Sequence, residues 1–145
     1  MEQWELMARE SIRDLVARYN GNGDAGRIDD VVALFAPDAV LDVMGTAHSG
    51  HAEIRGMFEQ AIADIAAGSP TERTVVQHHT STLQIDVTGP TSARARSYFQ
   101  VIMSGGLDHW GRYVDEFGIV DGRWVFRHRR VTVAGEIRGG WAASR

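Results

Sequence analysis

The sequence of 145 residues contains no cysteine. This absence excludes a disulfide framework and a thiol nucleophile. No run of about eighteen apolar residues, the length that a membrane-spanning helix needs, occurs anywhere in the chain. The first ten residues, Met1 to Glu10, lack the basic start and apolar centre of a signal peptide. We therefore expect a cytoplasmic protein with no membrane partner.

The chain also lacks an excess of positive charge. Its 15 basic residues face 19 acidic ones, so the net charge is −4 and no basic surface for nucleic acid is expected. Apolar residues make up 43% and charged residues 23% of the chain, the proportions of an ordinary globular domain rather than a disordered one. A chain of this length buries roughly 70% of its unfolded surface, which is enough for one real core. We expect residues 1–145 to form a single domain.

The first half of the sequence has the periodicity of amphipathic helices. Ile12, Leu15, Val16 and Tyr19 lie at i, i+3, i+4 and i+7, which marks one buried helix face. The same spacing recurs twice further on. The predicted helices are about 4–19, ended by Asn20 to Gly23; 28–35, ended by Pro37; and 54–65, ended by Gly68 to Pro70, with a strand expected at 39–44.

After Pro70 the apolar residues alternate with a period of two. Turn signals at 88–90, 104–106 and 121–122 divide this part into four predicted antiparallel strands, about 73–87, 91–103, 109–120 and 123–133. Helices followed by a sheet predict an α+β fold in which three helices cover one face of a curved sheet. Such a cone holds a small molecule at its mouth where the helices leave the concave face uncovered.

The apolar faces of these elements predict what lines that cavity. We expect the wall to consist of Phe35, Phe58, Phe99, Met103 and Phe117. Tyr113, on the same strand face as Phe117, adds a hydroxyl group that can donate a hydrogen bond. The cavity should therefore favour a hydrophobic ligand of one to four rings.

Four polar residues are candidates for chemistry, and each also has an ordinary structural explanation. Asp24 follows a glycine-rich turn and precedes a helix, so it can be an N-cap. His78 shares its strand with His79, and a strand can point only one of two neighbours inward. Tyr19 lies on a buried helix face, where a tyrosine is usually part of the core. Asp115 interrupts an apolar strand face, where a carboxylate pairs with a neighbouring arginine, lies near the rim of the cone or is used in catalysis.

Taken together, the motifs resemble the SnoaL-like branch of the nuclear transport factor 2-like superfamily. They are Tyr-x4-Asp (Tyr19, Asp24), Phe-Ala-Pro-Asp (35–38), Gln-His-His (77–79) before a long strand, and Asp-Gly-Arg-Trp (121–124). In plan the chain is similar to scytalone dehydratase, bile acid 7α-dehydratase and hexachlorocyclohexane dehydrochlorinase. Scytalone dehydratase has a second histidine and an asparagine where this chain has Met103 and Tyr113, and the second aspartate of the bile acid enzyme falls near Val101. The substrates of these two enzymes are therefore not expected.

The resemblance implies a cofactor-independent acid–base enzyme. Asp24 would orient His78, which would take a proton from a carbon atom, with Tyr19 at the place of the tyrosine found in some members. Asp115 stands where polyketide cyclases of the SnoaL type carry their acid–base aspartate. The implied activity is that of a dehydratase or another lyase acting on a cyclic or polyketide-like molecule. An isomerase or cyclase would use the same residues, and a non-catalytic binding module would need none of them.

Other kinds of site have weaker support. His48-x2-His51 and the pair His78–His79 lack the spacing of a helical metal motif, so no metal site is expected. There is no Gly-x-Ser-x-Gly elbow and no nucleotide-binding glycine motif. Arg94, Arg96 and Tyr98 alternate on the outward face of a long strand, which together with the habit of the family predicts a homodimer through that face. The tail, about 135–145, is expected to cover the pocket or to pack on a partner.

Overall fold

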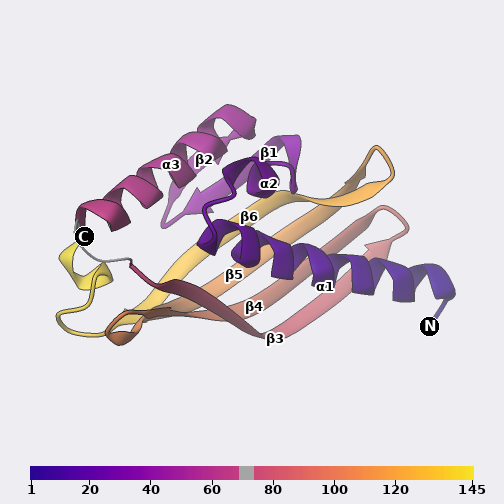
Figure 1. The fold of residues 1–145 in the computed structure, drawn as a ribbon. Helices are drawn as coiled ribbons and strands as arrows, with labels where there is room; N and C mark the ends of the chain where they lie inside the picture. The colour runs from indigo at the N-terminus through magenta and orange to yellow at the C-terminus, as the bar shows by residue number, and fades with distance from the viewer. Residues whose placement is uncertain (69–73) are drawn as a thin grey trace.

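A computed structural model describes residues 1–68 and 74–145 (Figure 1). The elements in chain order are α1 (Gln3–Asp24), α2 (Ile28–Val32), β1 (Phe35–Val43), β2 (Thr46–Ser49), α3 (Gly50–Gly68), β3 (Val76–Gly89), β4 (Ser92–Met103), β5 (Gly106–Val120), β6 (Arg123–Glu136) and the short 3-10 helix η1 (Ala142–Ser144). The turn expected at Ser69 and Pro70 and the strand start expected at residue 73 lie outside the described residues.

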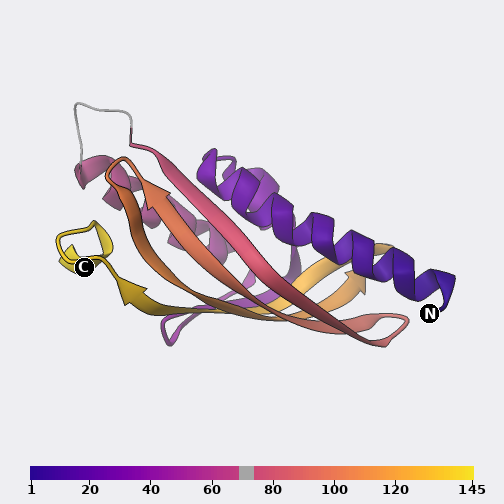
Figure 2. The same cartoon turned by 90° about the horizontal axis from the view of Figure 1, so that it is seen from below.

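The strands form one six-stranded sheet in the order β2-β1-β6-β5-β4-β3. Among the strands of residues 1–68 and 74–145, only the β1–β6 pair is parallel, so the sheet is mostly antiparallel. The sheet is curved, and the helices lie on one of its faces, α1 alongside β3 and α3 near β1 (Figures 1 and 2). This arrangement is the predicted α+β fold, in which helices cover one face of a curved sheet.

Helix α1 is longer than the sequence predicts, because it passes through the glycine-rich cluster at 20–23 and ends at Asp24. Its end is set by Gly26, which has a positive φ of 71°, a conformation that glycine adopts without strain. The Gly26 N–H donates to the Gly23 carbonyl and the Arg27 N–H donates to the Asn22 carbonyl, the two bonds of a Schellman motif. Asp24 is therefore in the last turn of α1 and does not cap α2, whose N-cap is Arg27.

The second predicted helix is too long, because α2 has only five residues and Phe35 already belongs to β1. A residue before proline disfavours the helical region, so Pro37 favours extended backbone at Ala36. Phe35 pairs with Phe126 of β6, which places this strand in the sheet. The structure also has a β1–β2 hairpin that the sequence analysis missed; Met44 and Gly45, both with positive φ, form its turn.

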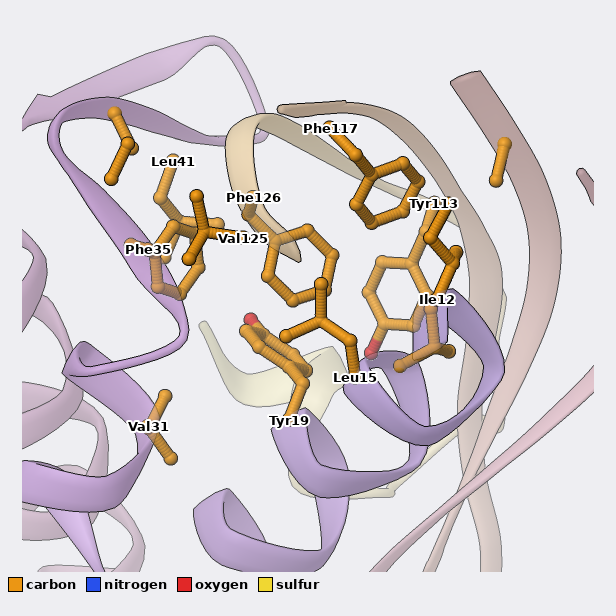
Figure 3. Packing of buried hydrophobic residues seen from close by; sticks show 14 of the residues in the cluster. Ile12, Leu15, Tyr19, Val31, Phe35, Leu41, Tyr113, Phe117, Val125 and Phe126 are labelled. Carbon is orange, nitrogen blue, oxygen red and sulfur yellow. The ribbon is translucent and has the colours of Figure 1, made fainter. Parts of the chain in front are cut away.

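The core lies between α1, α2 and the concave face of the sheet. Phe35, Tyr19, Phe117 and Phe126 meet there at ring distances between 5.1 and 6.0 Å (Figure 3). Edge-to-face and tilted aromatic pairs at such distances add attraction beyond the area that they bury. Each of the four side chains is at most 7% exposed.

This aromatic cluster contains a buried ion pair. The Arg129 Nε and Nη2 atoms donate to the two carboxylate oxygens of Asp115 over 2.8 and 2.9 Å, and neither side chain is exposed. The guanidinium group also lies over the rings of Tyr113, Tyr19 and Phe126, at 3.8, 4.2 and 4.5 Å from their centroids. Burial alone would lower the pKa of Arg129, but the charge and hydrogen bonds of Asp115 raise it above its ordinary value. The guanidinium group therefore stays charged.

No helix within residues 1–68 and 74–145 is both long enough and apolar enough to cross a membrane.

The buried pair predicts a large effect of Asp115→Asn. The substitution keeps the shape of the side chain but leaves Arg129 charged and without its anionic partner, which should lower the free energy of unfolding by about 3–5 kcal/mol. Urea denaturation at neutral pH measures the change. The control is Asp14→Asn in the exposed Asp14–Arg18 pair, which should change stability by less than about 1 kcal/mol. Equal effects of the two substitutions would contradict the prediction.

The outer face of the sheet generates a second prediction. Tyr98 and Val114 are 56% and 45% exposed, and they lie diagonally on β4 and β5 because Tyr98 pairs with Arg112 and Arg96 pairs with Val114. We propose that two copies of the chain pair through this face and bury more than about 1,000 Å². Sedimentation at micromolar concentration should show a dimer, and Val114→Glu should produce a monomer, whereas Arg13→Glu on α1 should not. A wild-type monomer would refute this.

Candidate active site

A cavity of about 940 Å³ lies between α3, the end of α1 and the sheet. Small-molecule pockets span roughly 300–1,000 Å³, so this one has room for a ligand of several rings. Helix α3 supplies only apolar side chains to the wall, namely Met57, Phe58, Ala61, Ile62, Ile65 and Ala66. The polar groups come from the other elements, chiefly Tyr19, Asn20, Asp24, His78, His109 and Tyr113.

Asp24 and His78 are in direct contact at the wall of this cavity. One carboxylate oxygen of Asp24 lies 2.6 Å from the His78 Nδ1 atom, and the other accepts the His78 backbone N–H at 2.7 Å. Two bonds from one residue fix both the position and the ring orientation of His78. A carboxylate at the C-terminal end of a helix faces the negative end of the helix dipole, so helix stability does not explain Asp24.

The contact determines where His78 can accept a proton. An ionised carboxylate only accepts hydrogen bonds. In a neutral His78 the Nδ1 atom therefore carries the proton, and this N–H group donates a hydrogen bond to Asp24. The lone pair is then on the Nε2 atom, away from Asp24. The side chain of His78 is 27% exposed and lines the cavity, so this nitrogen is accessible to a ligand. This arrangement would allow His78 to act as a base through its Nε2 atom, with Asp24 setting the tautomer.

A β-bulge explains why His78, and not His79, faces inward. The register of β3 against β4 shifts between Ser81 and Gln84, and Thr82 at the shift has a positive φ of 53°. A bulge adds one residue to a strand and so reverses the alternation of its side chains. Val76, His78 and Thr80 point inward before the bulge, whereas Leu83, Ile85 and Val87 do so after it. If the same residues formed a regular strand with no bulge, the face that carries Ile85 would carry His79.

The two tyrosines are placed differently in the wall. Tyr113 is stacked on Phe99, with ring centroids 4.7 Å apart, and its hydroxyl donates to the Asn20 Oδ1 atom at 3.3 Å. Tyr19 packs edge-on against Phe58 and Tyr113. Burial raises the pKa of Tyr19 and of Tyr113 above the ordinary value. Both hydroxyls are therefore neutral at physiological pH, so each acts as a hydrogen-bond donor or acceptor and not as an anion.

Several residues that the sequence analysis placed at the site are elsewhere. Of the predicted apolar lining, Phe58 and Phe99 line the cavity, but Phe35 and Phe117 belong to the core, as Figure 3 shows, and Met103 packs against that core. Phe35 and Phe117 do not reach the cavity because both pack against Phe126 in the aromatic cluster around Arg129. Asp115 also does not line the cavity, because both of its oxygens bind Arg129.

The sequence analysis missed two polar features of the wall. Asn20, which is 7% exposed, donates to the Thr80 Oγ1 atom and accepts from Tyr113, so it links α1 to β3 and β5. His109 lies beside Asp108, whose Oδ2 atom is 2.7 Å from the His109 Nδ1 atom. The sequence did contain a signal for this contact, the adjacent residues Asp108 and His109 at the start of the third predicted long strand. It was passed over because two neighbours on a regular strand point to opposite faces.

Asp108 also binds the C-terminal tail. Its Oδ1 atom accepts the Trp141 N–H at 2.6 Å, and its Oδ2 atom accepts the Ala142 N–H at 3.1 Å. Burial opposes ionisation of Asp108, but the hydrogen bonds from His109, Ala142 and Trp141 outweigh it, so the pKa lies below its ordinary value. Trp141 and Ala142 line the cavity, so the tail forms part of its wall. Across residues 1–68 and 74–145, no three His, Asp or Glu side chains are grouped in a way that could hold a metal ion.

Comparison with known families agrees with this architecture. The model of the SnoaL-like domain matches residues 4–130, which run from α1 through β5 into β6 and include Asp24 and His78 but not the C-terminal tail. The chain belongs to the SnoaL-like domain family. A search of curated protein sequences returns no match.

Several solved structures share the fold of this SnoaL-like protein. A putative scytalone dehydratase from Novosphingobium aromaticivorans DSM 12444 has 22% identity over 94% of this chain and 91% of that chain, with a TM-score of 0.78. An NTF2-like protein from Novosphingobium aromaticivorans has 23% identity over 97% and 90%, with a TM-score of 0.77. LinA has 14% identity over 94% and 93%, also with a TM-score of 0.77. At these identities the likeness is one of fold.

The lowered pKa of Asp108 predicts how stability changes in acid. A carboxylate whose pKa is depressed by folding stabilises the native state above its ordinary value of 3.8, and this contribution is lost as the pH falls through the lower native value. The SnoaL-like protein should therefore lose more stability than Asp108→Asn does when the pH falls from about 5 to about 2. Urea denaturation across this range measures it, with Asp86→Asn, exposed on β3, as the control. Parallel pH curves for the wild type and Asp108→Asn would contradict the assignment.

Proposed function

We propose that this SnoaL-like protein is a cofactor-independent acid–base enzyme that removes a proton from a carbon atom next to a carbonyl group. The substrate class is a hydrophobic cyclic or polyketide-like molecule, and the reaction is an elimination such as dehydration. His78 is the base, and Asp24 orients it and stabilises its protonated form. The observation that carries the proposal is the 2.6 Å contact between Asp24 and His78 at the wall of a large, mostly apolar cavity.

The supporting physical argument concerns the base and its surroundings. A neutral imidazole has an unperturbed pKa near 6.5, so at neutral pH it accepts a proton from a carbon made acidic by a carbonyl group. Tyr19 lines the same cavity as a neutral phenol and is a donor for the oxygen of the resulting enolate. The likeness to a putative scytalone dehydratase agrees with a dehydratase-like reaction.

Two alternatives from the sequence analysis use parts of the same site. An isomerase or cyclase begins with the same proton abstraction and differs only in the fate of the enolate. A non-catalytic binding module would need the apolar cavity but not the Asp24–His78 contact. Because Asp24 caps no helix, its two bonds to His78 favour the enzyme over the module.

Proton abstraction can be tested without the natural substrate. The exchange of the protons next to the carbonyl of α-tetralone for deuterium, followed by NMR in deuterated water, should be faster with the wild type than with buffer. His78→Ala should lower this rate by about 10²–10⁴-fold, the usual contribution of a general base. His79→Ala, next to it but on the exposed face, is the matched control and should keep the full rate.

Asp24 is tested by comparison with the double variant. Because an oriented base and its aspartate act as one unit, His78→Ala with Asp24→Asn should lose little more activity than His78→Ala alone. Asp24→Asn should remain folded, since an asparagine oxygen can still accept the His78 N–H. Binding of α-tetralone without exchange would identify a binding module, and an Asp24→Asn variant with normal exchange would remove Asp24 from the mechanism.

A further inference from the structure

The cavity contains a second histidine with its own aspartate. His109 lines the wall, and its Nδ1 atom lies 2.7 Å from the Asp108 Oδ2 atom. Both residues are largely buried, with side chains 12% and 5% exposed. As at His78, the carboxylate accepts a hydrogen bond from the Nδ1–H group. The Nε2 atom of His109 is therefore the nitrogen that can exchange a proton with a ligand.

The arrangement depends on a second β-bulge. On β4, Val101 pairs with His109 and the next residue, Ile102, pairs with Leu107, so Asp108 is the extra residue of β5. A bulge re-aims side chains that would otherwise alternate. It allows Asp108 to reach its neighbour His109 while His109 remains on the cavity side. Figure 1 shows this part of β5 beside the C-terminal tail.

The tail holds Asp108 in this position. The backbone N–H groups of Trp141 and Ala142 donate to its two oxygens, and a side chain at Gly140 would come within 2.6 Å of its Oδ1 atom. The Trp141 ring lies 6.1 Å from the His109 ring. The tail therefore closes one side of the cavity and fixes the orientation of His109 through the same carboxylate.

The two histidines face a common space. Both rings lie close to the Phe99 ring, at centroid distances of 6.1 Å for His78 and 6.2 Å for His109. Because both imidazoles line the one cavity of about 940 Å³, a ligand of several rings that fills it next to Phe99 can contact both. Elimination of water needs two proton transfers at neighbouring atoms, one from carbon and one to the departing oxygen, and a single base supplies only the first.

We propose that His109 is the acid of the reaction and that the substrate is a hydrophobic β-hydroxy ketone. This inference rests on the proposed function of His78. The neutral His78 Nε2 atom takes the proton from the carbon next to the carbonyl as the carbon–carbon double bond forms. The carbon–oxygen bond breaks, and protonated His109 gives its Nε2 proton to the hydroxyl, which leaves as water. Protons then pass from His78 to solvent and from solvent to His109, which restores the starting state.

The surroundings of His109 on every element are consistent with a proton donor. Asp108 places a carboxylate 2.7 Å from the Nδ1 atom of the ring. Glu136 of β6 is its register partner, and Arg145 of the tail lies with its guanidinium group against the Trp141 ring. β4 contributes the apolar Phe99 ring, β3 contributes His78, and α3 contributes apolar side chains only.

Two probes that differ only in the leaving group test the proposal. β-Hydroxypropiophenone must have its hydroxyl protonated to react, whereas β-(para-nitrophenoxy)propiophenone releases para-nitrophenolate, a stable anion, without an acid. The wild type should accelerate both eliminations, followed by ultraviolet absorbance of the enone and by the colour of the phenolate. His109→Gln should slow the hydroxy substrate by at least about a hundredfold and leave the aryloxy substrate within about twofold of the wild type.

The remaining variants separate the possible failures. His78→Gln should lose both reactions, and the control His79→Gln should lose neither. Asp108→Asn, as a positioning residue, should show the same selective loss as His109→Gln, and NMR of the ring nitrogens should show a change in the tautomer of His109. If His109→Gln slows both probes equally or neither, His109 is not the acid. If neither reaction of the wild type depends on His78, the proposed function itself fails, and this inference with it.

Discussion

The buried pair of Arg129 and Asp115 is the constraint on which the architecture depends. Removing two charges from water costs several kcal/mol for each ion, and here the cost is offset by two aligned hydrogen bonds and by three aromatic rings around the guanidinium group. Tyr19 of α1, Tyr113 of β5 and Phe126 of β6 must all be present for this environment to exist. The pair thus ties the first helix to the centre of the sheet, and the cavity forms where that packing ends.

This constraint explains which parts of the fold could be predicted from the sequence. The order of helices and strands follows from local periodicity, because a buried face leaves its period in the sequence. The end of α1 could not be found in this way, because the glycines at 21 and 23 read as breakers while the turn that ends the helix is made by Gly26. Tertiary contacts of Tyr19 and Asn20 outweigh the modest helix propensity of glycine.

The site shows the same division. The Asp24–His78 contact was expected from the resemblance of the motifs. From the residues alone, the first explanation for Asp24 was that it caps the following helix. Asp115 was recognised as an unusual carboxylate on an apolar face, but its partner fourteen positions away was not identified. The Asp108–His109 pair was missed because strand alternation separates neighbours, and only a bulge brings them together. Sequence patterns assume regular elements, so they fail where one residue is added.

The bulge at Thr82 has a consequence for which histidine the strand can present. Because β3 carries two adjacent histidines, it can pair with β4 in two registers. With the bulge, His78 pairs with Val101 and faces the cavity; in a regular strand that ran through Thr82, His79 would take this place. Loss of the bulge without loss of a residue would therefore exchange the two imidazoles while the inward apolar residues 83, 85 and 87 keep their places.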